Sequence, residues 1–152
     1  MKSVKDVNVK SKSVFVRVDY NVPMDQSLNI TDDNRIVATL ELIRYLLSQN
    51  ARIILASHLG RPDGKKDEKF SLLPVKERLS LLLNQPVLFA PDCIGDVVKQ
   101  MAGDLKDGQI VLLENLRFHA EEKKNDEAFS RQLADLCDVY VNEAFSVCHR
   151  DQ

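Results

Sequence analysis

The feature that most constrains the fold is an arrangement repeated three times: an apolar, strand-like run that ends in a short polar loop. The runs are 14–18, 52–56 and 110–113, and the loops are 19–23, 57–62 and 114–119. In an open parallel sheet, the ligand crevice lies outside the carboxyl ends of the strands. Because the loops contain Asp, Asn, His and Arg, we expect them to meet at one edge of a sheet. Their cationic side chains favour a small ligand with several negative charges.

Strand and helix patterns alternate along the rest of the chain. The predicted strands are 13–18, 51–56, 87–89, 110–113 and 139–141, and the predicted helices are 34–49, 74–83, 92–101 and 125–136. Apolar residues recur at helical period in 34–49, whereas 51–56 is nearly all apolar, as expected of a strand covered on both faces. This alternation predicts an α/β fold. We expect an open parallel sheet of about five strands with helices on both faces, in a three-layer, Rossmann-like αβα arrangement.

Several residues at the expected helix ends predict specific caps. Residues 31–33 offer N-cap side chains to the first helix, and Asn50 suits the left-handed position after its end. Pro74 suits the first turn of the second helix. Asp92 can cap the third helix.

Composition limits the classes of function. The chain has 152 residues, 44% of them apolar, which is enough for one domain with a substantial core. A net charge of -2 gives no basic field for nucleic acid, and no apolar run reaches the length of a membrane span. Residues 1–6 lack the apolar core of a signal peptide, and Cys93, Cys137 and Cys148 form no C-x-x-C pair. We therefore expect a cytoplasmic protein that binds neither nucleic acid nor membrane.

The loop 57–62 has the most specific local pattern. His58 and Arg61 bracket Gly60, which permits close approach of the backbone, and Pro62 stiffens the exit. Turn formation alone does not require this combination of residues, so the pattern favours a binding loop.

Four further candidates have structural alternatives that the local pattern leaves open. Asp19 and Asn21 could bind a ligand or only shape a turn. Arg35 could bind a ligand or pair with the aspartates that precede it. Arg117 lies between apolar neighbours and needs a partner, which is either a ligand or Glu114.

Motifs for metals and nucleotides fail on spacing. His58, His119 and Cys148 have no local zinc-ligand spacing. Segment 60–66 departs from the P-loop pattern, and no G-x-G-x-x-G follows the first strand. We expect no metal site and no bound cofactor on this chain.

Five segments resemble the N-terminal half of the phosphoglycerate kinase family, in order and in spacing. They are 16–23, 30–36, 57–62, 112–119 and 139–145, and the likeness runs from about 11 to 150. The resemblance implies a two-lobed glycolytic kinase, monomeric as the full-length enzyme. It implies reversible phosphoryl transfer between 1,3-bisphosphoglycerate and ADP, giving 3-phosphoglycerate and Mg-ATP. Residues 1–152 would be the substrate-binding domain, with the C-terminal nucleotide-binding domain absent and the chain inactive alone.

The resemblance also implies the residues of the substrate site. Asp19 and Asn21 would bind the hydroxyl and carboxyl end of the glycerate, and Arg35 would stabilise the transferring phosphoryl group as the catalytic arginine. The implied basic patch comprises Arg35, His58, Arg61, Arg117 and Arg150. The chemistry is consistent, because the acceptor is a carboxylate with a pKa near 4 and needs no general base. Phosphoryl transfer needs positioning and charge neutralisation, and arginine forks suit phosphate oxygens.

The end of the chain departs from the family. Residues 145–152 read Phe-Ser-Val-Cys-His-Arg-Asp-Gln, where the family usually has Phe-Gly-Thr-Ala-His-Arg-Ala-His. Asp151 adds negative charge beside Arg150, and the sequence stops soon after its fifth predicted strand, which suggests truncation. Two other hypotheses follow: a non-catalytic interaction module whose partner lobe covers the surface beyond that strand, and a generic phosphate-binding α/β domain.

Overall fold

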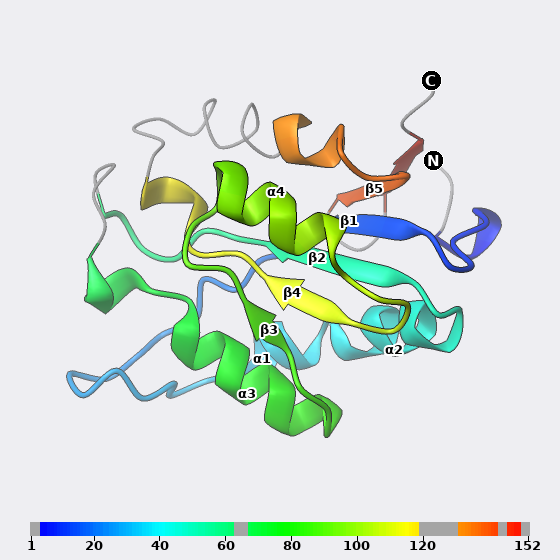
Figure 1. Cartoon of the computed structure of the whole chain (residues 1–152). Coiled ribbons are helices and arrows are strands. Elements are labelled where there is room, and N and C mark those ends of the chain that lie inside the picture. Colours follow the sequence, from blue (N-terminus) through cyan, green and yellow to red (C-terminus); the bar gives the residue numbers. More distant parts are fainter. Residues whose placement is uncertain (1–3, 63–66, 119–130, 143–145, 150–152) are drawn as a thin grey trace.

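A six-stranded sheet forms the centre of the protein (Figure 1). The computed structural model describes residues 4–62, 67–118, 131–142 and 146–149. The spatial order of the strands is β3-β4-β2-β1-β5-β6. Their bounds are β1 (Ser13–Arg17), β2 (Arg52–Ala56), β3 (Leu88–Phe89), β4 (Ile110–Leu112), β5 (Val139–Asn142) and β6 (Ser146–His149). Neighbours from β3 to β5 pair in parallel, which confirms the predicted parallel α/β sheet.

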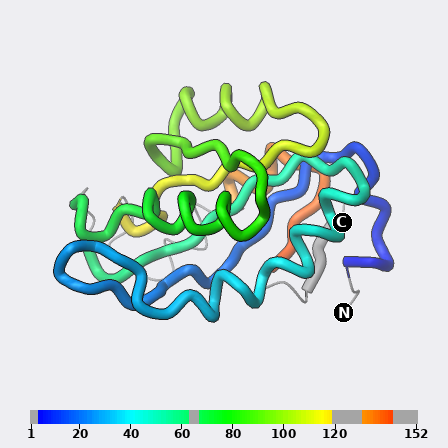
Figure 2. Tube along the Cα trace, turned by 90° about the horizontal axis from the view of Figure 1, so that it is seen from below, coloured from blue at the N-terminus to red at the C-terminus, as the bar shows by residue number. Residues whose placement is uncertain are grey.

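Helices cover both faces of this sheet, as the sequence predicts. One face packs against α1 (Asn34–Val37), α2 (Leu40–Ser48) and α3 (Leu73–Leu83), which lie below the sheet in Figure 1 and nearest the viewer in Figure 2. The other face packs against α4 (Asp96–Gly103) and the helical residues 131–134. Alternation along β1 divides the core, because Val14 and Val16 belong to the first cluster and Phe15 to the second.

The sixth strand was not predicted. The sequence predicts β5 as the last strand, whereas β6 pairs antiparallel with it and places Ser146 opposite Asn142. An antiparallel neighbour needs only a short connection, unlike the helical crossovers between the parallel strands. β6 therefore lies at the edge where the interaction-module hypothesis places a partner.

The helix predicted over 34–49 is two helices separated at Ala38 and Thr39. The Thr39 hydroxyl donates to the carbonyl of Ile36 (2.8 Å) and lies 2.7 Å from the hydroxyl of Tyr20. Because a threonine hydroxyl has one proton, Tyr20 must be the donor of the second bond. A buried polar contact to the loop after β1 thus lies at the break between α1 and α2.

The predicted caps have mixed outcomes. Asn50 has the expected left-handed backbone (φ 57°), and Pro74 lies in the first turn of α3. The prediction for Asp92 is wrong, because its carboxylate accepts from the amide of Cys93 (2.7 Å) and α4 begins after Gly95. Gly95 has φ 100°, which a continuous helix cannot include. Residues 125 and 126, the predicted start of the fourth helix, lie outside the described residues.

Among the helices of the described ranges, none combines the length and apolar character needed to cross a membrane.

Buried Cys93 yields a test of the packing between β3 and α4. Burial, together with the negative charge of Asp92, raises the pKa of the Cys93 thiol to about 12. Alkylation needs an accessible thiolate. We therefore expect iodoacetamide at about pH 8 to leave Cys93 unmodified in the folded chain and to modify it in concentrated urea. Mass spectrometry of the cysteine peptides measures both, and rapid alkylation of the folded chain would contradict this packing.

Candidate functional site

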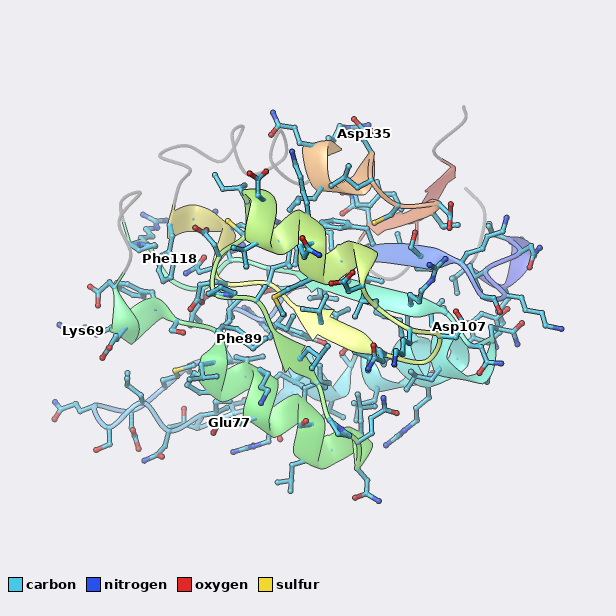
Figure 3. The ribbon with its side chains drawn as sticks, viewed as in Figure 1. Lys69, Glu77, Phe89, Asp107, Phe118 and Asp135 are labelled. Atoms are coloured by element: carbon cyan, nitrogen blue, oxygen red, sulfur yellow. The ribbon has the colours of Figure 1, made fainter. Side chains whose placement is uncertain are left out.

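The polar loops meet at one edge of the sheet. Strands β1, β2 and β4 end on the left of Figure 1, where the loop after β1, the loop after β2 and the 3-10 helix η3 (Leu116–Phe118) lie. Figure 3 places Lys69 and Phe118 on this side and Asp107 at the opposite end of the strands. The common direction of parallel strands produces this convergence.

Hydrogen bonding between the chain segments continues past the ends of the strands. The amide of Val18 donates to the carbonyl of Ala56 (3.0 Å), and the amide of Tyr20 donates to Ser57 Oγ (2.9 Å). The carbonyl of Ser57 accepts from the amide of Leu116 (3.0 Å). Ser57 is fully buried, so this residue joins all three loops inside the protein.

Asp19, Asn21 and Arg35 form one cluster. Arg35 Nη1 donates to the carbonyl of Asn21 (2.6 Å) and to Asp19 Oδ1 (3.3 Å). The side chains of Arg35 and Asp19 are 51% and 63% exposed, so their ion pair contributes little stability. The aspartates before Arg35 have other partners: Asp33 pairs with Arg78 (2.8 Å), and Asp32 accepts from the amide of Asn34 (2.8 Å).

Gly60 links this cluster to the loop after β2. Its amide donates to Asn21 Oδ1 (2.9 Å), and its carbonyl accepts from Arg117 Nη1 (3.4 Å). Its φ of +61° is a left-handed conformation that favours glycine. In the same loop, His58 is half-buried and Arg61 is exposed. The structure therefore brings together Asp19, Asn21, Arg35 and Arg117 around the backbone of Gly60.

Two buried polar residues, Glu114 and Asn115, follow β4 after one intervening residue, Leu113. Glu114 accepts three hydrogen bonds, from Ser71 Oγ (2.7 Å), the amide of Leu72 (2.8 Å) and the amide of Asn115 (2.9 Å). The ion pairs of the described residues include none between Glu114 and Arg117, and Arg117 Nη1 donates instead to the carbonyl of Gly60.

The fully buried Asn115 was not among the predicted site residues. Its side chain bonds to the backbone of Leu59, Phe70 and Arg117. The available sequence signal was a pair of polar residues immediately after an apolar, buried strand.

Other predicted residues cannot be placed. Arg150 and His119 lie outside the described residues, as does the side chain of Cys148. The role of Arg150 stays a prediction. Of the three residues in the zinc alternative, only the side chain of His58 is among those that the structure describes. Among the residues that the structure describes, no group of three or more His, Cys, Asp or Glu side chains could hold a metal ion.

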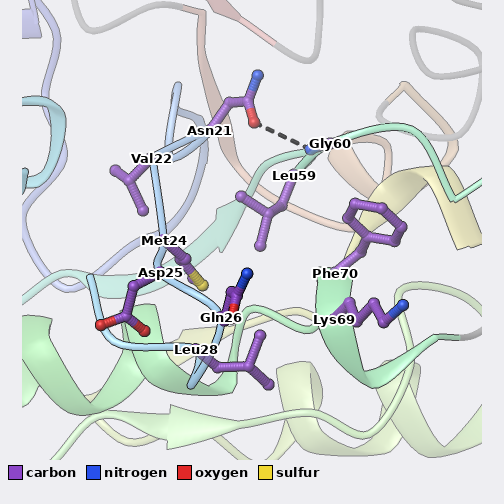
Figure 4. A pocket seen from close by; sticks show the side chains of 10 residues that line it. All are labelled: Asn21, Val22, Met24, Asp25, Gln26, Leu28, Leu59, Gly60, Lys69 and Phe70. Carbon is purple, nitrogen blue, oxygen red and sulfur yellow. Dashed lines mark hydrogen bonds between the residues drawn. The ribbon is translucent and has the colours of Figure 1, made fainter. Parts of the chain in front are cut away.

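A pocket of about 550 Å³ lies beside this cluster (Figure 4). Its lining residues are Asn21, Val22, Met24, Asp25, Gln26, Leu28, Leu59, Gly60, Lys69 and Phe70. The lining includes Asn21 from the predicted set but none of its arginines. The carboxylate of Asp25 accepts hydrogen bonds from Ser27 and Asn29 within its own turn, and those from Asn29 lower its pKa. The pocket is therefore a neighbour of the cationic cluster and not its centre.

The chemistry of the cluster suits an anion. Two guanidinium groups, those of Arg35 and Arg117, donate to backbone carbonyls, which orient these cations. The buried carboxylate of Glu114 already accepts three hydrogen bonds, so it does not fit as a magnesium ligand. Burial raises the pKa of Tyr20 well above its usual value, which keeps its hydroxyl neutral. The arrangement can bind and orient a multiply charged ligand.

Comparison with known proteins gives consistent matches along almost the whole chain. The family model for phosphoglycerate kinase matches residues 4–152. The phosphoglycerate kinase of Anaeromyxobacter sp. (strain Fw109-5) is 55% identical over an alignment of 152 positions that covers 99% of this chain and 38% of that protein. The phosphoglycerate kinase of Aquifex aeolicus is 56% identical over 149 residues, 98% of this chain and 37% of that protein. The chain thus spans little more than a third of the length of these curated relatives.

The fold matches solved structures as well. The crystal structure of phosphoglycerate kinase from Pyrococcus horikoshii OT3 aligns with a TM-score of 0.83 at 34% identity, covering 95% of this chain and 36% of that one. The phosphoglycerate kinase from Coxiella burnetii aligns with a TM-score of 0.78 at 38% identity, covering 93% of this chain and 34% of that one.

Gly60 provides a test of the loop geometry, with Gly108 as a matched control. Both have positive φ, +61° and +83°, so alanine at either position is strained by about 1–2 kcal/mol. A Cβ atom at Gly60 would also lie 2.4 Å from the Phe70 ring, whereas nothing lies within 4 Å at Gly108. We expect Gly60→Ala to lower the free energy of unfolding more than Gly108→Ala does, as measured by urea denaturation. Equal losses would show that Phe70 does not pack on Gly60.

Proposed function

Because the chain belongs to the phosphoglycerate kinase family, a family of glycolytic kinases, we propose that it is the 3-phosphoglycerate-binding, N-terminal domain of such an enzyme. The complete enzyme transfers a phosphoryl group reversibly between 1,3-bisphosphoglycerate and ADP, giving 3-phosphoglycerate and Mg-ATP. A separate C-terminal domain holds the nucleotide and magnesium, so this chain does not turn over alone. We propose that the complete enzyme is a cytoplasmic monomer.

The observation that supports this proposal is a continuous path of hydrogen bonds between two arginines. Arg35 bonds to the carbonyl of Asn21, the side chain of Asn21 bonds to the amide of Gly60, and the carbonyl of Gly60 bonds to Arg117. Three loops from three strands contribute to this path. A ligand with a phosphate at one end and a carboxylate at the other needs cations held in fixed positions relative to each other.

The proposed roles divide the site between the two ends of the ligand. Asp19 and Asn21 bind the hydroxyl and carboxyl end of the glycerate, and Arg35 stabilises the phosphoryl group during transfer. The remaining cations neutralise and orient the ligand; they are His58, Arg61, Arg117 and Arg150.

No general base is required in this mechanism. The accepting carboxylate of 3-phosphoglycerate is ionised at neutral pH, because such groups have a pKa of about 4. The work of the domain is to position that oxygen and to neutralise charge around the phosphoryl group. A cluster of arginines held by backbone carbonyls suits that work, with Arg35 and Arg117 as its described examples.

Calorimetric titration with 3-phosphoglycerate tests the site directly. We expect the unaltered chain to bind 3-phosphoglycerate and not Mg-ATP. Arg61→Ala and Arg117→Ala should each weaken binding about tenfold or more, because a hydrogen bond to a charged group contributes about 1.5–3 kcal/mol. Absence of 3-phosphoglycerate binding by the folded, unaltered chain would contradict the proposal.

Arg44→Ala is the matched control for this titration. Arg44 lies on α2 and bonds to the carbonyl of Leu82 (3.2 Å), so the substitution removes one positive charge away from the loops. It should leave binding unchanged. Competition with inorganic phosphate separates the generic phosphate-binding hypothesis, which predicts that phosphate displaces 3-phosphoglycerate at comparable concentration.

Turnover is expected only when both domains are present. The chain alone, mixed with 3-phosphoglycerate and Mg-ATP, should show no formation of ADP in a coupled assay, since no group on it is proposed to hold the nucleotide. Fusion to the C-terminal domain of a close relative should restore activity. Turnover by the chain alone would contradict the assignment of the nucleotide site to the other domain.

A further inference from the structure

We propose that Asn115 is a positioning residue for the phosphoglycerate site. Its buried amide holds the loop that contains His58 and Arg61 at a fixed separation from Arg117. This inference rests on the proposed function, because it assigns these residues a common ligand. Asn115 itself is fully buried and is not proposed to touch that ligand.

The side chain of Asn115 makes as many hydrogen bonds as an amide can make. Oδ1 accepts from the amides of Leu59 (3.2 Å) and Arg117 (3.0 Å). Nδ2 donates to the carbonyls of Leu59 (2.7 Å) and Phe70 (2.8 Å). An amide side chain has two acceptor sites and two donor protons, so its capacity is filled.

The hydrogen bonds from Asn115 fix the backbone of the loop after β2 between two of the proposed ligand-binding residues, His58 and Arg61. Both backbone groups of Leu59 are held, and Leu59 lies between His58 and Gly60. The peptide units on either side of Leu59 therefore cannot rotate without breaking a buried hydrogen bond, which is costly. The two hydrogen bonds to Leu59 therefore fix the backbone at His58, just after β2. They also fix the start of the segment that leads to Arg61.

The same side chain also holds the other half of the cluster. The amide of Arg117 bonds to Asn115 Oδ1, while Arg117 Nη1 reaches the carbonyl of Gly60. Arg117 is thus fixed at its backbone and at its guanidinium to the two segments that Asn115 joins. Displacement of Asn115 would move both anion-binding loops relative to each other, and small displacements cost binding and rate when several groups must act together.

Only an amide fits these four partners. Aspartate at this position would place a carboxylate oxygen against the carbonyls of Leu59 and Phe70, which are both acceptors. Serine would retain one hydroxyl and lose most of the bonds. Both changes leave every proposed ligand-binding side chain in place. Asn115→Ser adds no charge, so its effect on binding reports position alone, whereas Asn115→Asp also places a carboxylate near the proposed anion site.

The test compares Asn115→Asp and Asn115→Ser with Ser80→Ala. Ser80 also bonds to two backbone groups, the carbonyl of Gln85 (2.9 Å) and the amide of Val87 (2.9 Å), but it lies before β3 at the opposite end of the strands. Titrations with 3-phosphoglycerate are made well below the unfolding temperature of each variant, and amide NMR spectra follow Gly60 and Arg117. We expect both Asn115 variants to bind about tenfold more weakly or worse, with shifted Gly60 and Arg117 amides. Ser80→Ala should bind normally even where it unfolds at a lower temperature.

Each outcome decides between the alternatives. If the unaltered chain binds and a folded Asn115→Ser binds within about twofold of it, the positioning role is overturned and the proposed function stands. If the unaltered chain does not bind 3-phosphoglycerate, both proposals fall. If neither Asn115 variant folds while Ser80→Ala does, Asn115 serves the fold and not the site, which also overturns the inference.

Discussion

The site depends on one constraint: backbone polar groups just past the ends of parallel strands need partners once they are buried. Strand pairing satisfies these groups only as far as Ala56 on β2, where Val18 makes the last bond of that kind. Beyond that point, buried side chains replace the neighbouring strand. Ser57, Glu114 and Asn115 perform this role, and each is almost completely buried. Hydrogen bonds from these buried side chains therefore order the loops on the side that faces the core. The side that faces solvent is left for a ligand.

The same constraint explains how several cationic side chains can lie near one another without each pairing with a nearby carboxylate. Carboxylates near the loops are mostly committed elsewhere: Asp33 to Arg78, and Glu114 to two backbone amides and a serine hydroxyl. Arg35 and Arg117 also donate to backbone carbonyls, which orient their guanidinium groups. The exposed pair of Asp19 and Arg35 is the exception, and an exposed pair is weak enough for a phosphate to compete with it. Phosphoryl transfer requires positive charge that is oriented toward the phosphoryl group.

Most of the architecture could be predicted from the sequence, because hydrophobic period and strand-end polarity are local signals. The parallel sheet, its covering helices, Asn50 and Pro74 are all confirmed, and the strand-end loops do converge. Contacts that depend on distant partners could not be predicted. Thr39 interrupts a continuous apolar stripe because it meets Tyr20, and Asp92 does not cap α4 because Cys93 and Gly95 redirect the chain. Asn115 illustrates the same limit, since its partners Leu59 and Phe70 are 56 and 45 positions away in the sequence.

Under the proposed function, binding and turnover are separable, because the loops proposed to bind the ligand are anchored in the core of this domain. The strands before the loops contribute to both hydrophobic clusters, and the buried polar residues that hold the loops come from the same chain. A ligand held by such loops gains orientation before any nucleotide is present. Under the proposed function, the second domain supplies the phosphoryl donor and its metal, and these loops supply the geometry of the acceptor. Substitutions beneath the loops should therefore act first on ligand affinity, whereas substitution of Arg35, at the exposed edge of the cluster, should act mainly on the transfer step.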